Sequence, residues 1–321
     1  MVKFLNRENE VIRSRKKTRT DKFVRLAFFL LALLCSLSVV FILLFIIYKG
    51  LSPFINDYVI DGESYKVDLW SFLIGNSWMG NQANYGAGFI VINTLYIALW
   101  TTLLSAPISI LTALVVVRMS QKYIGKIIEF AIELLASIPS VIFGMFGMGI
   151  ITNWTKSLAD IFDYQTFGGQ SNMSAILVLT MMSVPTITML AISAIKNVKQ
   201  DLINGSLALG ASISQTNYKV VLMSARSGIF AGIILGVNKA LGEATAVTMV
   251  AGNAINGPSF NLFSTTRTLT STMLAEMGEA TGLNYDIRFS CGILLLFIII
   301  VINYLLLHLN SKIGGIKNAK K

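Results

Sequence analysis

The chain has few charged residues, and this scarcity excludes an ordinary soluble protein. Asp, Glu, Lys and Arg make up 13% of the 321 residues, whereas hydrophobic residues make up 54%. Soluble domains carry about 25% charged residues. The mean hydropathy of +0.68 points the same way, so we expect an all-α integral membrane protein.

Residues that usually carry catalysis or metal binding are also scarce. The one histidine, His308, lies near the end of an apolar run, and both cysteines, Cys35 and Cys291, lie within apolar runs. A single histidine excludes an H-E-x-x-H zinc site, and the cysteines have neither metal-ligand spacing nor a context that calls for a disulfide. The sequence therefore predicts neither an enzyme nor a metal centre.

A nucleotide-binding motif is absent as well. No G-x-x-x-x-G-K-[ST] sequence occurs, since the only Gly-Lys pair, Gly125–Lys126, is followed by isoleucine. The chain therefore cannot hydrolyse ATP through a P-loop. If it transports a solute actively, the energy must come from a gradient or from a separate subunit.

Long apolar runs are what the chain does have, and six of them reach the roughly 20 residues that cross a membrane. They lie at about 24–48, 88–117, 127–151, 173–195, 226–251 and 289–309. We expect a basic N-terminal tail (1–23), a six-helix membrane domain (24–309) and a basic C-terminal tail (310–321). The first run is too long for the apolar part of a cleavable signal peptide, so it should remain as a helix.

The distribution of basic residues predicts the orientation of the helices. Lys and Arg concentrate in the two tails, in the turn 118–126 and in the segment 196–225, whereas the other connections dilute them with Asp and Glu. By the positive-inside rule both termini are cytoplasmic, which also fits an even number of spans. The net charge of +10 is therefore a signal of membrane topology and does not predict a nucleic-acid partner.

The fifth run carries two charges deep in an apolar segment, Lys239 and Glu243. Lys239 is roughly 18 Å from the start of the span at 1.5 Å per residue, which is close to mid-bilayer. A charge there costs at least ~2.5–3.5 kcal/mol, so it should face the bundle interior and have a partner. Glu243, four residues later, is expected on the same helix face. Either the pair neutralises itself and serves folding, or Lys239 lends positive potential to a path for an anion.

Small residues and prolines predict which helices pack closely. Glycines recur every four residues in the fifth run, and such a stripe lets a neighbouring helix approach: Gly228, Gly232 and Gly236. Three prolines fall inside or near the middle of spans: Pro107, Pro139 and Pro185. Each frees a carbonyl that neighbours or water must satisfy, so these helices belong in a bundle or beside a cavity.

The basic segment 196–225 is longer than a connector needs to be, because most connections have about 4–6 residues. A first helix over Gln200–Leu209 is expected to end at Gly210, a residue suited to the left-handed conformation, and a second stretch leads into the fifth run. The segment is either a solvated loop or a docking element for a soluble partner.

At this segment the chain resembles the cytoplasmic EAA loop of ABC-importer permeases. In SLALGASISQTNYKVVL the glycine of that loop corresponds to Gly210, although Asn204-Gly205-Ser206 stands where E-A-A is expected and Met223 where proline is expected. The resemblance implies that an ATPase subunit is contacted by the centre of this loop: Ser206, Ala208, Leu209, Gly210 and Ala211.

Three further segments look like the PstC-type permease subunit of phosphate ABC importers. They are ASIPSVIFGMFG (136–147), SARSGIFAGIILGVNKALGEATAVTMVAGN (224–253) and TTRTLTSTMLAEMGEATG (265–282). The resemblance implies a type I ABC-importer permease fold in the bacterial plasma membrane. It also implies a PstA-type permease partner, a PstB-type ATPase dimer that binds the ATP, and a PstS-type protein that delivers inorganic phosphate.

The family usually has arginine at the position of Lys239 and glutamate at that of Glu243, and the resemblance implies that this pair is needed for transport. Arg267, expected on the outer side, is a further candidate for the substrate path. Two alternatives stay open within the class, a PstA-type subunit or a permease for another oxyanion. A gradient-driven secondary transporter is the alternative from a different class.

Overall fold

The computed structural model describes residues 2–60 and 63–313 and divides into two compact units, Met1–Lys49 and Gly50–Lys321. The first unit is the start of one long helix, α1 (Val2–Ile55), so the described part of the expected N-terminal tail is helical. Apolar side chains between Phe23 and Phe45 are exposed all around this helix, as expected of a span that faces lipid. Of the expected C-terminal tail, residues 314–321 lie outside the described residues.

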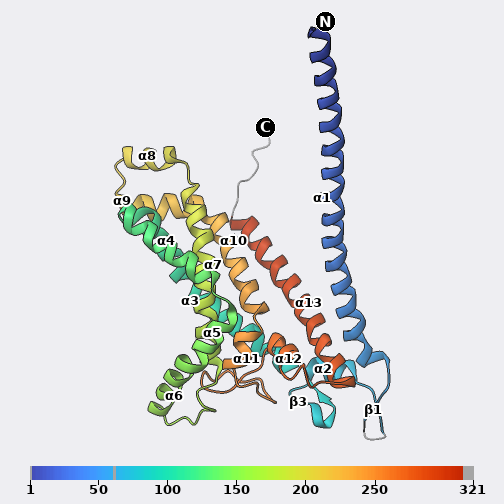
Figure 1. Cartoon of the computed structure of the whole chain (residues 1–321). Helices are drawn as coiled ribbons and strands as arrows, with labels where there is room; N and C mark the ends of the chain where they lie inside the picture. Colours follow the sequence, from blue (N-terminus) through green and yellow to red (C-terminus); the bar gives the residue numbers. More distant parts are fainter. Residues whose placement is uncertain (1, 61–62, 314–321) are drawn as a thin grey trace. The chain divides into compact units, whose positions relative to one another are not determined.

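The second unit is a helical bundle with two small hairpins (Figure 1). Its bundle segments are α3 (Gly88–Leu114), η2 (Val115–Met119), α4 (Lys122–Ser137), α5 (Ser140–Phe146), η3 (Gly147–Ile151), α6 (Thr152–Ile161), α7 (Asn172–Lys196), α10 (Leu222–Gly242), α11 (Thr245–Val250) and α13 (Gly282–Ile313). η2, η3 and a later segment, η4, are π-helical turns. α7 is the most buried of the described spans and packs against α3 and α10.

Shorter elements lie at the two ends of this bundle (Figure 1). One end, which we call the α8 end, carries α8 (Gln200–Ala208), α9 (Ile213–Gln215) and η4 (Thr216–Val221). The other, the hairpin end, carries β1 (Tyr58–Ile60), β2 (Glu63–Tyr65), α2 (Leu69–Ile74), β3 (Trp78–Met79), η1 (Gly80–Gln82), β4 (Asn84–Tyr85) and α12 (Leu269–Leu274). Both hairpins are antiparallel, with Tyr58 opposite Tyr65 and Trp78 opposite Tyr85.

Five described helices are long and apolar enough to cross a membrane, and counting one bent pair of helices as a single span gives six. That pair corrects the expected third span, 127–151, which is not one straight helix. α4 and the following helix, Ser140–Ile161, meet at 94°. Ile138 has extended backbone (φ −67°, ψ 128°), because the residue before proline is disfavoured in the helical region, and Pro139 then caps α5.

The expected fifth span, 226–251, is also interrupted. α10 ends at Gly242, Glu243 is extended (φ −78°, ψ 116°), and a separate helix, α11, begins at Thr245. The expectation that Lys239 and Glu243 lie one helical turn apart on a continuous helix is therefore wrong. Lys239 occupies the last turn of α10 and Glu243 lies in the break.

The glycine stripe of α10 lies against α7. A Cβ on Gly228 would lie 2.6 Å from the Cβ of Ala194, and one on Gly236 would lie 2.5 Å from Cδ1 of Ile187. Gly232 lies between them, next to Leu190. Because glycine has no side chain, the backbone of α10 packs directly against side chains of α7.

Replacing Gly228 by alanine is expected to destabilise the α7–α10 contact by about 1–3 kcal/mol, the usual cost of overpacking. The new methyl group would meet Ala194 Cβ, which is attached directly to the backbone and cannot rotate away. Thermal unfolding in detergent measures the effect. Gly242→Ala is the control, because a Cβ there has open space around it. Equal melting temperatures for both variants would contradict the proposed close contact.

Candidate functional site

Lys239 is held inside the bundle by neutral oxygen atoms. Its Nζ donates to the backbone carbonyl of Met182 at 2.9 Å and to Oγ1 of Thr186 at 3.0 Å, both on α7. Pro185 lies between these two acceptors in the sequence, and its missing N–H leaves the neighbouring Met181 carbonyl without its usual helical donor. Among the described residues no carboxylate lies within 4.0 Å of the ammonium group.

Glu243 has a different local role from the one expected. Its Oε1 accepts a hydrogen bond from the backbone N–H of Ala246 at 3.1 Å, in the first turn of α11. It does not bind Lys239, although it is near enough to attract the ammonium group electrostatically. The helix break stabilises both charges, because a cation is favoured at the end of α10 and an anion at the start of α11.

Thr270 connects this break to the loop that carries Arg267. Its Oγ1 donates to the backbone carbonyl of Glu243 at 2.8 Å, and it lies in the first turn of α12. The break after α10, which carries Glu243 and follows the Lys239 turn, is thus joined by a hydrogen bond to α12 and the 265–272 segment. Arg267 itself lies beside the β3–η1 residues Trp78 and Gly80, which belong to the hairpin end of the bundle.

Arg267 is almost fully buried, with 5% of its surface exposed. It donates one hydrogen bond, from Nη2 to the backbone carbonyl of Asn253 at 3.0 Å, while its Nε has no partner within the described part of the chain. Burial lowers the pKa of its guanidinium group, Glu276 raises it, and Arg288 lowers it further. Arginine remains charged in such surroundings because its pKa is about 12 or higher in water.

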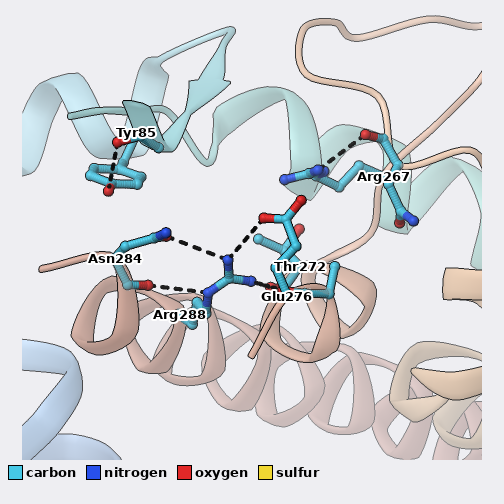
Figure 2. Close-up of polar contacts among 9 residues, drawn as sticks. Tyr85, Arg267, Thr272, Glu276, Asn284 and Arg288 are labelled. Atoms are coloured by element: carbon cyan, nitrogen blue, oxygen red, sulfur yellow. Dashed lines mark hydrogen bonds and ion pairs between the residues drawn. The ribbon is translucent and has the colours of Figure 1, made fainter. Parts of the chain in front are cut away.

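Arg288 is the neighbouring cation, and sequence reasoning assigned it no role. It is 1% exposed and donates to the carbonyls of Thr272, Ala275 and Asn284 and to Oδ1 of Asn284. Its Nη2 also lies 3.4 Å from Oε2 of Glu276. Figure 2 shows the Glu276 carboxylate between the two guanidinium groups, joined only to Arg288.

The apolar run beginning at residue 289 placed Arg288 just outside the membrane in the sequence interpretation. In the structure, α13 begins at Gly282, so Arg288 lies within the helix, where it joins α12 to α13. The available signal was the lone arginine directly before a long apolar run. Its role was not deducible, because its acceptors are backbone carbonyls of another segment.

The segment 200–221 at the α8 end forms the expected helix, turn and second helical stretch. Gly210 has a φ of +87° and ends the first helix, and Ser212 caps the second in a capping box with Gln215. Ile203 is buried and anchors α8, whereas Leu209 projects with 91% of its surface exposed. Of the other expected contact residues in this loop, Ala208 is exposed, whereas Ser206 and Ala211 are half-buried.

Side-chain hydrogen bonds attach this loop to the bundle. Ser206 Oγ lies 2.9 Å from Oγ1 of Thr216, which joins α8 to η4. Arg118 Nε donates to Oδ1 of Asn217 at 3.1 Å, which joins η4 to η2. η4 continues directly into α10, so the loop and Lys239 are connected through one uninterrupted helical segment.

A bundle of apolar spans, a broken helix that carries a half-buried lysine, and a projecting loop at one end are typical of a multi-pass membrane transport subunit. The chain belongs to the family of binding-protein-dependent transport system inner membrane components, which matches residues 105–314. It is therefore a multi-pass protein of the inner membrane and a component of an ABC importer.

Curated relatives match most of the chain. The phosphate transport system permease protein PstC of Pasteurella multocida is 31% identical over 255 residues, which is 75% of this chain and 79% of that protein. The probable ABC transporter permease protein YqgH of Bacillus subtilis is 29% identical over 318 residues, covering 96% and 98%. Proteins named PstC from Haemophilus influenzae and Xylella fastidiosa are 30% and 26% identical.

Solved structures share the fold. A chain of a bacterial alginate ABC transporter has a TM-score of 0.56 at 16% identity, covering 88% of this chain and 94% of that one. A chain of the MetNI methionine ABC transporter has a TM-score of 0.51 at 16% identity, covering 76% and 97%. The type I ABC-importer permease fold expected from the sequence is therefore confirmed.

Proposed function

We propose that this chain is the PstC-type permease subunit of an ATP-driven importer of inorganic phosphate. The observation that carries the proposal is Lys239, a half-buried ammonium group on a membrane helix whose two hydrogen-bond acceptors are both neutral. Such a charge costs free energy unless it serves an anion or pairs with one. The names of the PstC relatives support phosphate as that anion.

The transport path passes the break between α10 and α11. Lys239 supplies positive potential as a compact point charge, which suits transient passage better than the bidentate grip of arginine. Glu243 occupies the Ala246 N–H, so that donor does not retain the anion. Tight and selective binding then resides in a PstS-type protein outside, and a PstA-type permease supplies the other half of the path.

The α8 end faces the cytoplasm in this proposal. The basic residues at this end support the orientation, as the positive-inside rule requires: Arg118, Lys122, Lys126, Lys196, Lys199 and Lys219. Both chain termini are then cytoplasmic. The exposed Leu209 and its neighbours dock on a PstB-type ATPase dimer, which performs the ATP hydrolysis, so this chain catalyses no reaction itself.

Reconstitution tests the proposal. The chain is purified with its partner permease, ATPase and binding protein, inserted into liposomes, and assayed for uptake of ³²P-labelled phosphate. We expect uptake that requires internal ATP and every subunit. Equal uptake driven by an ion gradient with this chain alone would establish a secondary transporter instead. Sulfate or molybdate uptake in place of phosphate would keep the class and change the substrate.

A further inference from the structure

A cavity of about 330 Å³ opens beside Arg267 at the hairpin end. Its wall combines the first strand and turn of one hairpin with residues from three other segments: Trp78, Met79, Gly80, Gln82, Ile255, Arg267, Glu276 and Asn284. A water molecule takes about 30 Å³ in the liquid, so the cavity holds a tetrahedral oxyanion together with several hydration waters. The cavity is separate from Lys239, which lies on α10.

The hydrogen-bonding capacity of the two arginines is unequally used. Arg288 donates hydrogen bonds to carbonyl groups of α12 and α13, so it joins these two helices. Arg267 lines the cavity, and its one hydrogen bond to a described residue runs from Nη2 to Asn253. Its Nε is fully enclosed without a described partner, and its Nη1 is left accessible to a ligand. A buried donor without an acceptor is unfavourable, and more so when it is charged, because it has lost its hydration without gaining a hydrogen bond.

Asn284 adds a second donor to the same cavity. Its Oδ1 faces Nη2 of Arg288 at 3.4 Å, which turns the amide nitrogen the other way. That nitrogen, Nδ2, lies 3.3 Å from the position that a Cβ on Gly80 would occupy, nearer than the amide oxygen. An N–H donor and a guanidinium group thus border one space, which is the combination that binds oxyanions.

The charges around the cavity do not balance. Two buried guanidinium groups face a single carboxylate, Glu276, whose side chain is 69% exposed. The backbone of Glu276 has a φ of +58°, and that of Asn253 has a φ of +46°. A positive φ is uncommon for glutamate, and strained backbone gathers at ligand clamps, whereas asparagine adopts this conformation more readily. Glu276 pairs with Arg288, and the Asn253 carbonyl accepts from Arg267.

We propose that this cavity is an outer oxyanion subsite, in which a phosphate ion binds Arg267 and Asn284 and takes the place of the Glu276 carboxylate beside the arginines. The proposal rests on the proposed phosphate import and adds a binding site that the ion occupies before it reaches Lys239. Glu276 balances the excess positive charge while the subsite is empty and competes with the incoming ion. The affinity of the subsite for phosphate is accordingly low, because an ion on a transport path has to dissociate again.

Direct binding of phosphate to the membrane complex tests the subsite. The two permease subunits and the ATPase dimer are placed in nanodiscs without the binding protein, and binding of ³²P-phosphate to this complex is measured. Arg267→Gln is expected to lower the affinity at least about tenfold, the value of a charged hydrogen bond. Glu276→Gln is expected to raise it about two- to fivefold, since an exposed ion pair is worth less than about 1 kcal/mol.

Glu279→Gln is the matched control, because it removes the same charge three residues from Glu276 at an exposed position that does not line the cavity. Its affinity should equal that of the wild type. Binding that ignores all three substitutions, or no saturable binding at all, would overturn the subsite. A third outcome would also overturn the subsite: the Arg267→Gln complex binds phosphate like the wild type but no longer captures the binding protein. The cavity would then be a docking site for a protein.

Uptake by the wild-type complex separates this inference from the proposed function. If ATP-driven uptake of phosphate is absent, the assigned substrate is wrong, whatever binds in the cavity. If uptake is present and the Glu276→Gln gain is missing, only the outer subsite is overturned. The gain should persist in a Lys239→Met complex, because the two cations lie on different elements.

Discussion

Lys239→Met is expected to reduce ATP-driven phosphate uptake by at least about a hundredfold, the range seen when one preorganised electrostatic group is removed from a site. Methionine keeps the length and apolar character of the side chain, so packing against α7 changes little. The substitution removes the ammonium group and its bonds to Met182 and Thr186. Uptake of ³²P-phosphate into proteoliposomes measures the effect, and co-purification of all subunits verifies assembly.

Lys239→Arg is the matched variant, since it restores the charge and should retain substantial uptake. Thr186→Val removes one acceptor of the lysine without removing charge, and a smaller loss is expected from it. If Lys239→Met imports phosphate at the wild-type rate, the lysine serves folding only. The proposed path at the α10–α11 break would then be wrong.

Leu209→Asp is expected to abolish co-purification of the ATPase, with a loss of affinity of at least about tenfold. The side chain is 91% exposed at the tip of the α8 segment, so the free chain loses no packing. In a docked complex, a carboxylate at the centre of an apolar contact is desolvated without a partner, which is the usual origin of large interface effects. Pull-down with the purified ATPase and ATP-driven uptake both report the result.

Phe167→Asp is the control for this substitution. Phe167 is 72% exposed on the connection between α6 and α7, away from the α8 end, and it receives the same change from apolar to acidic. Its ATPase capture should equal that of the wild type. Equal capture by both variants would show that the loop is not the docking element, and equal loss would indicate a general defect in assembly.

Much of the architecture follows from the chain itself. Apolar runs of about 20 residues predict membrane helices because a backbone in lipid must satisfy its own hydrogen bonds. The left-handed Gly210 and the two-part loop at 200–221 were predictable because their signals are local. The glycine spacing of α10 likewise predicted a close helix contact, and α7 supplies it.

The charged positions needed the tertiary structure. Lys239 and Glu243 are four residues apart, and periodicity alone favours a pair on one helix face. The observed break depends on a carboxylate that caps the next helix and on Thr270, which reaches the Glu243 carbonyl from another segment. Hydrogen bonds formed across long sequence separations leave no local pattern.

The sequence by itself determined a multi-pass helical membrane protein with a two-part helical loop at one end, because hydropathy, glycine spacing and turn residues act over short distances. Only the tertiary structure decided that Lys239 is held by α7 and that Glu276 pairs with Arg288 beside Arg267 (Figure 2). These contacts depend on which segments the fold brings together. The cost of burying a charge is therefore met by partners that sequence spacing does not reveal.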